Sequence, residues 1–232
     1  MARYLVLDTE TTGLDPKSDR VVEIAATLVA PEGVSVVVDH LVYPGRSIPP
    51  NASAVHHITD PMVASSPTLE EVWTTYVLPL LSTVDGIVAH NAAFDRPFLP
   101  PTDKPWICTL RLARHTWPEA PGHSNQVLRY WLGLDVDAPH PHRAADDTMV
   151  TAQIFLRLLP VIMAQSGLGD RLDALALAEL ANAPIKVSSM PFGKHKGTAL
   201  DQVPHDYIRW ALANMTALDA DLRWSLSQEV EK

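Results

Sequence analysis

Two consecutive β-branched runs constrain the fold of this chain more than any other feature of its sequence. Residues 21–30 (VVEIAATLVA) and 34–43 (VSVVVDHLVY) are rich in valine, and the turn-forming tripeptide Pro31-Glu32-Gly33 separates them. Two such runs joined by a short turn predict an antiparallel hairpin. A shorter apolar run at residues 4–7 precedes the hairpin, so we expect the first three strands to form a meander.

Downstream of the hairpin, the apolar pattern alternates between strand and helix. Thr68 and Glu71 have the spacing of a capping box, and helical periodicity follows them as far as Leu80. The pattern predicts short strands at residues 86–89 and 106–109, and helices at residues 124–133 and 144–165. We therefore expect an α/β fold with a mixed five-stranded sheet, antiparallel in its first three strands and flanked by helices.

The length of 232 residues suits one or two domains, and we expect three segments. Residues 1–167 would form the α/β domain. Residues 168–189 would contain a further helix, at 170–183, and a linker, while residues 190–232 would form a small C-terminal segment containing FGKHKG. This motif lacks the serine or threonine of a P-loop, so a structural hairpin fits it at least as well as a phosphate-binding loop.

The composition excludes several classes of protein. Hydrophobic residues make up 47% and charged residues 19% of the chain, which is typical of a globular protein rather than a disordered one. No apolar run reaches the length of a membrane span and Asp8 comes too early for a signal peptide, so we expect a cytoplasmic protein without a membrane partner. Cys108 is the single cysteine, which excludes an intrachain disulfide and a cysteine-based zinc site.

The net charge of −9 does not by itself exclude a nucleic-acid partner. Free proteins that bind polyanions usually have a basic surface. A site that holds divalent cations with several carboxylates, however, is acidic in sequence and much less acidic once the cations are bound.

Three segments place carboxylates at strand ends or helix starts. Asp8 and Glu10 follow the first strand, where residues i and i+2 point to the same face. Asp95 follows the fourth strand within HNAAFD, and His142 and Asp147 precede and open the long helix within HRAADD. Taken alone, each segment also fits an ordinary solvated turn or an acidic helix start.

Taken together, the three segments supply four carboxylates and one histidine. That composition is typical of two-metal phosphoryl hydrolysis. Carboxylate oxygens favour Mg²⁺, with Mn²⁺ as a substitute, over zinc. A histidine is suited to take a proton from an attacking water.

In this order the motifs resemble those of the DEDDh family of 3′→5′ exonucleases, also called DnaQ-like or RNase T-like, which has an RNase H-like fold. The patterns D-x-E, N-x-x-x-D and H-x-x-x-x-D are all present, and the resemblance covers residues 3–165, with the tail matching more loosely. It implies four metal-binding carboxylates and one general base, namely Asp8, Glu10, Asp95, Asp147 and His142.

The resemblance also implies an activity. A member of this family would use two Mg²⁺ ions per site to hydrolyse the terminal phosphodiester of a nucleic acid and release nucleoside 5′-monophosphates. Residues 106–114 and the FGKHKG tail are similar to the exodeoxyribonucleases of the family, which favours DNA and a role in DNA repair. The implied partners are DNA 3′ ends, single-stranded or duplex, and a homodimer is left open.

Seven residues are candidates for holding the substrate: Thr9, Thr11, Gly13, Leu14, His56, Asn91 and Phe94. A glycine lets the backbone approach the terminal nucleotide closely. Leu14 would wedge beside the terminal base, and His56 and Phe94 would pack on the penultimate one. An ordinary loop position for Leu14 and a core position for Phe94 are the alternatives. Four arginines are candidate phosphate contacts or simply solvated, namely Arg96, Arg111, Arg114 and Arg143.

Two alternatives remain at this stage. The catalytic residues do not separate DNA from RNA, because that discrimination depends on contacts to the 2′-OH, so an exoribonuclease or a polymerase proofreading subunit fits as well. A catalytically silent nucleic-acid-binding module is the alternative of another class, and the complete set of five residues argues against it.

Overall fold

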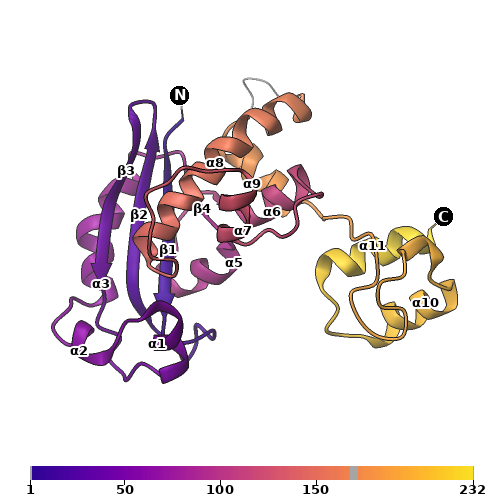
Figure 1. Ribbon diagram of the computed structural model, residues 1–232, viewed down its shortest axis with the longest axis horizontal. Helices are drawn as coiled ribbons and strands as arrows, with labels where there is room; N and C mark the ends of the chain where they lie inside the picture. Colours follow the sequence, from indigo (N-terminus) through magenta and orange to yellow (C-terminus); the bar gives the residue numbers. More distant parts are fainter. Residues whose placement is uncertain (1, 168–171, 232) are drawn as a thin grey trace. The chain divides into compact units, whose positions relative to one another are not determined.

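The computed structural model describes residues 2–167 and 172–231 of the chain. These residues divide into two compact units, Met1–Ala181 and Asn182–Lys232 (Figure 1). The first unit contains the sheet and the second contains the FGKHKG segment.

The first unit is built on a five-stranded sheet with the strand order β3-β2-β1-β4-β5. β2 pairs antiparallel with both β1 and β3, whereas β4 pairs parallel with both β1 and β5. The expected mixed sheet with an antiparallel meander is therefore confirmed. Its strands are β1 (Tyr4–Thr11), β2 (Val21–Ala30), β3 (Gly33–Leu41), β4 (Gly86–Ala89) and β5 (Trp106–Cys108).

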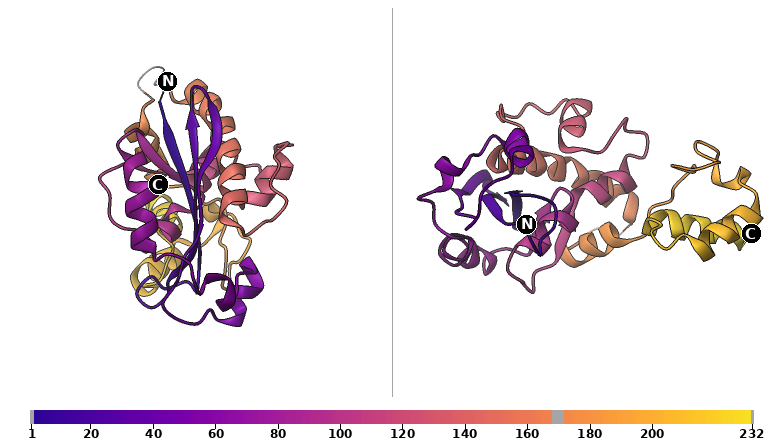
Figure 2. Two further views of the ribbon diagram at one scale, coloured as in Figure 1. Left: turned by 90° about the vertical axis from the view of Figure 1, so that its left-hand side faces the viewer. Right: turned by 90° about the horizontal axis from the view of Figure 1, so that it is seen from below.

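Helices cover both faces of this sheet (Figure 2). On one face lies a continuous helical segment that starts at the predicted capping box, in which the Glu71 N–H donates to Thr68 Oγ1 at 3.3 Å. On the other face lies a long helix, whose Ile154, Phe155 and Leu158 are fully buried. The segment on the first face comprises α3 (Leu69–Val72), the π turn η1 (Trp73–Val77) and α4 (Leu78–Leu81), and the long helix is α8 (Ala144–Ser166).

Shorter helices connect the strands. The sequence pattern predicted the helix after Ser124, but not the two helices after β3 or the one directly after β5. The connecting helices are α1 (Pro50–His56), α2 (Asp60–Val63), α5 (Ala92–Asp95), η2 (Arg96–Phe98), α6 (Thr109–Thr116) and α7 (Asn125–Trp131).

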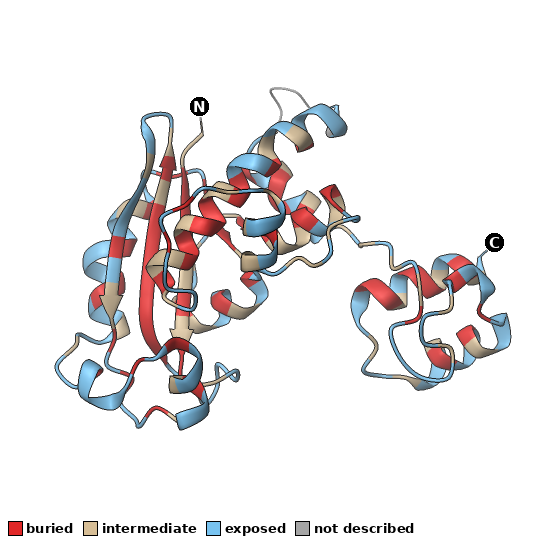
Figure 3. Ribbon diagram, viewed as in Figure 1, coloured by how far each residue is buried: buried red, intermediate tan, exposed pale blue. Residues whose placement is uncertain are grey.

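By length and composition alone α8 could cross a membrane, with a mean hydropathy of 1.4. The sequence nevertheless contains no uninterrupted apolar run as long as a membrane span. Half of that stretch is buried inside the protein. Figure 3 shows buried and exposed stretches alternating along α8. Its apolar character is thus accounted for by packing against β1, β2 and β3.

The boundary between the units lies further along the chain than the sequence pattern placed it. α9 (Ala174–Asn182), which we expected to lie between the two domains, buries Ala174, Leu177 and Ala181 in the core of the first unit. The first residues of the helix expected at 170–183 lie outside the described residues. Helical periodicity showed that this segment has an apolar face, but not which core that face would join.

The second unit has a small core of its own, formed by Met190, Leu200, Val203, Ile208, Leu222 and Leu226. A single bridge between Ser189 and Ala199 closes the FGKHKG loop at its base. Two helices follow this loop in the unit. The elements are η4 (Leu200–Gln202), α10 (His205–Asn214) and α11 (Ala220–Val230).

Candidate active site

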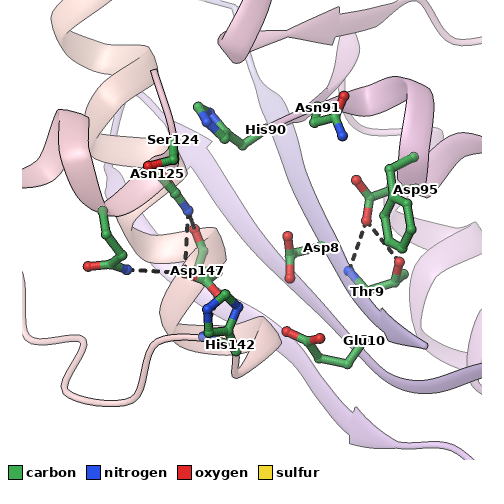
Figure 4. Close-up of a pocket in the computed structure, with 12 residues that line it drawn as sticks. Asp8, Thr9, Glu10, His90, Asn91, Asp95, Ser124, Asn125, His142 and Asp147 are labelled. Atoms are coloured by element: carbon green, nitrogen blue, oxygen red, sulfur yellow. Dashed lines mark hydrogen bonds between the residues drawn. The ribbon is translucent and has the colours of Figure 1, made fainter. Parts of the chain in front are cut away.

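A cavity of about 470 Å³ opens where β1 and β4 end, beside the start of α8 (Figure 4). It contains all five residues of the predicted catalytic set and three of the seven predicted substrate contacts. The lining residues are Asp8, Thr9, Glu10, His90, Asn91, Phe94, Asp95, Ser124, Asn125, Gln126, His142 and Asp147.

β1 directs Asp8 and Glu10 into this cavity. Along the last four residues of the strand, Thr9 and Thr11 are buried while Asp8 and Glu10 are partly exposed, which is the alternation of a strand with two different faces. In the view of Figure 4 Asp8 lies between Asp95 and Asp147. Glu10, His142 and Asp147 offer ligand atoms that all lie within 4.8 Å of one another.

Thr9 holds Asp95 in place. Both the backbone N–H and the hydroxyl of Thr9 donate to Asp95 Oδ1, at 3.1 and 2.8 Å. Asp95 is only 2% exposed, so it depends on these donors for solvation. Asn91 begins the turn that carries Asp95, in a left-handed conformation with φ of 72°. The structure therefore gives Thr9 a positioning role in addition to its place in the cavity wall.

Asp147 is held by three residues. The backbone N–H of His142 donates to Oδ2 at 2.8 Å, and the side-chain amide of Gln126 donates to Oδ1 at 3.3 Å. Asn125 donates to the backbone carbonyl of Asp147 at 3.1 Å and to Thr151 Oγ1 at 3.2 Å. The sequence analysis did not identify Asn125 or Gln126 as site residues. Two adjacent amides in the first turn of this helix were the available signal.

A buried ion pair fixes the loop that carries His142. Glu23, only 1% exposed, accepts hydrogen bonds from the Arg143 guanidinium and, at 2.8 Å, from the backbone N–H of Ala144. Glu23 lies directly across from Glu10 in the pairing of β1 with β2. The sequence analysis missed Glu23, although an acid inside a β-branched run was a signal that it needs a partner.

Burial and mutual repulsion disfavour the charged forms of the four carboxylates. Burial, and then the charges of Asp95 and Asp147, raise the pKa of Asp8 well above its ordinary value. Burial and the charge of Asp147 raise the pKa of Glu10 to about 8. Burial raises the pKa of Asp95 to about 7, against the effect of the Thr9 hydrogen bonds, and burial also raises the pKa of Asp147.

This electrostatic arrangement fits divalent cations. No lysine or arginine is among the described residues that line the cavity. Four clustered carboxylates without a cation are costly to keep ionised, and hard cations with oxygen ligands remove that cost. The donor set is therefore suited to Mg²⁺ or Mn²⁺.

His90 also lines the cavity, but it is held as a neutral structural residue. Its Nε2 donates to the backbone carbonyl of His123 at 2.8 Å, and its Nδ1 is hydrogen-bonded to Thr109 Oγ1 at 2.9 Å. Burial lowers the pKa of His90 to about 4. His90 thus links the end of β4 to the loop before α7. Asn125 and Gln126 are the first two residues of that helix.

Four of the seven predicted substrate contacts are not part of the cavity wall. Thr11 Oγ1 donates to the Gly13 carbonyl at 2.6 Å, and Gly13 lies so close to Asp19 that a side chain there would collide with the carboxylate. Leu14 is 83% exposed. His56 is 2% exposed, and its Nδ1 accepts the Ile58 N–H, so its ring has no free face for a base.

Two of the four arginines considered for phosphate contacts have other partners. Arg143 pairs with Glu23, and Arg111 Nε donates to the Ala181 carbonyl at 2.6 Å.

Comparisons with known families and proteins agree with this geometry. The sequence model of the RNase T exonuclease family matches residues 5–155. A second family model, named for a quorum-sensing-regulated virulence factor, matches residues 176–214.

The chain is 36% identical to exodeoxyribonuclease 10 of Escherichia coli K12, over 97% of this chain and 98% of that protein. It is 40% identical over 70% of its length to a DNA polymerase III subunit epsilon-like protein of Rhodobacter capsulatus, of which it covers 24%. A solved structure of Exonuclease X in complex with 5′ overhanging duplex DNA has a TM-score of 0.64 at 37% identity, over 77% of this chain and 99% of that one. Exonuclease I of E. coli with a dA16 oligonucleotide matches at a TM-score of 0.56 and 20% identity, over 74% of this chain and 43% of that one, which shows a shared fold.

Proposed function

The chain belongs to the RNase T (DEDDh) exonuclease family, and on this premise we propose that it is a 3′→5′ exodeoxyribonuclease that releases nucleoside 5′-monophosphates. The observation that carries the proposal is that the five residues of the DEDDh pattern line one cavity at the end of β1. The similarity to exodeoxyribonuclease 10 spans both units of the chain, which favours this function over that of a polymerase proofreading subunit.

DEDDh exonucleases use divalent metal ions, and the four carboxylates of this cavity fit that requirement. We propose that Asp8, Glu10, Asp95 and Asp147 hold two Mg²⁺ ions, for which Mn²⁺ can substitute. When bound, such a pair supplies stabilisation of the attacking and leaving oxygens during displacement at phosphorus.

His142 is the proposed general base. It lies in the loop before α8 with a positive φ of 63°, and its backbone N–H is fixed to the Asp147 carboxylate. Its exposed imidazole can therefore reach a water in the cavity and take a proton from it. Because the Glu23–Arg143 pair fixes the next residue, the imidazole is presented from a supported loop rather than a free one.

The remaining cavity residues are proposed to hold the end of the strand. Phe94 packs against Phe98 at 5.3 Å between ring centroids and presents a partly exposed ring to the cavity, where a base can stack. Asn91 and Ser124 offer polar groups to the sugar and phosphate. Leu14, which projects into solvent, is proposed to wedge beside the terminal base pair of a duplex.

The proposed substrates are DNA 3′ ends in single strands and in duplexes. The relative that was solved with 5′ overhanging duplex DNA supports the duplex part of this proposal. A role in DNA repair, a cytoplasmic location and a homodimer stay predictions from the sequence.

Incubation of the protein with 5′-labelled single-stranded DNA and its RNA counterpart tests the proposal, with Mg²⁺ or with EDTA. We expect a Mg²⁺-dependent ladder that shortens DNA from the 3′ end. Asp147→Asn, which keeps an acceptor for the His142 N–H, should abolish the ladder. Preference for RNA would contradict the proposed substrate, and absence of cleavage with binding intact would favour the silent binding module.

A further inference from the structure

The second unit differs from the first in charge. Within residues 182–232, six lysines and arginines balance six aspartates and glutamates, so residues 1–181 carry the whole net charge of −9. Repulsion of a polyanion is therefore weaker at the second unit than at the first.

Three aromatic rings form a row on this unit. The His195 ring contacts the Tyr207 ring edge-on at 4.5 Å between centroids, and Tyr207 contacts Trp210 at 5.7 Å. Trp210 is 51% exposed and Phe192, in the same loop as His195, is 37% exposed. Neither of these two side chains belongs to the core of the unit, so core packing does not explain the presence of two large apolar rings at exposed positions.

Two lysines lie in the loop that carries His195. Lys194 and Lys196 lie on either side of His195 and are both exposed. Gly193 and Gly197 bound the lysine pair with φ of 72° and 82°, and the Lys196 N–H closes the turn on the Gly193 carbonyl at 3.2 Å. Gly193 also lies against the Tyr207 hydroxyl, which seats the loop on α10.

We propose that this surface, the aromatic–basic patch (Phe192, Lys194, His195, Lys196, Tyr207 and Trp210), binds single-stranded DNA. Exposed rings beside cations match the two parts of a single strand, because bases stack on the rings while phosphates contact the lysines. A duplex does not offer its base faces in this way, since they are already stacked. The choice of DNA over RNA rests on the proposed function.

Such a patch gives the enzyme a second hold on the strand whose end it degrades. A second binding module raises the effective concentration of a ligand that can reach both modules. The effect requires a strand long enough to do so. We therefore expect the patch to matter more for long substrates than for a tetranucleotide.

Binding of a fluorescent oligonucleotide to the full-length protein in EDTA tests the stacking part. Trp210→Ala should weaken binding of a strand of roughly 20 nucleotides by about 10-fold, in the range observed for loss of one stacked base, and Trp210→Phe should restore most of it. Trp224 on α11 is a matched control, because it is 37% exposed and outside the patch. Trp224→Ala should bind as the native protein does.

The salt dependence of the same binding tests the phosphate part. The double variant Lys194→Ala/Lys196→Ala should lower the slope of log K against log salt by about 1.4, at ~0.7 for each lost phosphate contact to a single strand. Lys186→Ala, an exposed lysine outside the patch, should leave the slope unchanged. Both lysines of the double variant are exposed, so the variant is expected to fold normally.

Native-like binding and slope in both patch variants would overturn the inference, and so would stronger binding of RNA than of DNA. Hydrolysis of a tetranucleotide separates this result from the proposed function. Absence of hydrolysis together with patch-dependent binding would contradict the proposed exonuclease alone. Normal hydrolysis together with patch-independent binding would contradict the inference alone.

Discussion

Arg143 and Glu23 form a two-point ion pair between the start of α8 and the first part of β2. Arg143 Nε donates to both Glu23 oxygens, at 3.0 and 3.2 Å, and Nη2 donates to Oε1 at 2.5 Å. Glu23 is almost fully buried, so its charge is tolerated only because the guanidinium and the Ala144 N–H satisfy it. The pair ties the His142 loop to the sheet that carries Asp8 and Glu10.

Glu23→Gln should therefore impair both stability and catalysis. Loss of a charged hydrogen-bond partner costs ~2 kcal/mol at a partly exposed arginine, which should lower Tm by about 4–8 °C. The value of kcat should fall because the His142 loop is released. Thermal unfolding and steady-state hydrolysis measure the two effects.

Glu32→Gln is the control for this prediction. Glu32 pairs with Arg3 at the same distance, but both side chains are substantially exposed, so Tm should change little. A Glu23→Gln variant whose Tm and kcat match those of Glu32→Gln would show that the buried pair does not support the loop.

Thr9→Val should lower kcat by about 10-fold and raise the metal concentration needed for half-maximal activity, because a hydrogen bond to a charged group contributes ~1.5–3 kcal/mol. Valine keeps the β-branched shape but removes the hydroxyl that donates to Asp95. Thr9→Ser, which retains the hydroxyl, should recover most of the activity. Equal kinetics in the two variants would show that the hydroxyl does not position Asp95.

The strand-based part of the site was predictable from sequence. A period of two places Asp8 and Glu10 on one face of β1, and that local rule needs no tertiary information. The positions of Asp95 and Asp147 came from motif spacing, and the structure brings both carboxylates to the cavity. The meander was predictable because the turn tripeptide lies between two runs of matching length.

The supporting contacts were not predictable in the same way. The partner of Glu23 lies 120 residues away, so only the packing of α8 on β2 reveals it. His56 was assigned to the substrate, but α1 turns its side chain inward, and no periodic pattern predicted that seven-residue helix. Asn125 and Gln126 gain their role only where α7 meets α8.

Gln126→Glu should reduce activity more than Gln126→Ala does. The new carboxylate would lie about where the amide now donates to Asp147 Oδ1, and a like charge disfavours the ionised form of its neighbour. The pKa of Asp147 should rise further, so the acidic limb of the pH–rate profile should move to higher pH. An acidic limb at the native position in Gln126→Glu would contradict this prediction.

Stability without metal should fall as pH rises between about 4.5 and 8. The pKa of Glu10 rises from 4.5 to about 8 on folding, and the pKa of Asp95 rises to about 7. The folded state therefore holds protons that the unfolded state has already released in this interval, and each step up in pH favours unfolding. Below the unfolded pKa both states are protonated, so the effect vanishes there.

Divalent cations should reverse this trend, because they bind the ionised carboxylates of the folded state and stabilise it by mass action. We expect Tm in EDTA to decrease from pH 5 to pH 8, and the increase in Tm on addition of Mg²⁺ or Mn²⁺ to be larger at pH 8 than at pH 5. Asp8→Asn removes one of the repelling charges and one ligand, so it should raise Tm in EDTA at pH 8 while abolishing most of the increase with metal. A native protein whose Tm in EDTA rises over this interval would show that the four carboxylates are not clustered in the unliganded protein.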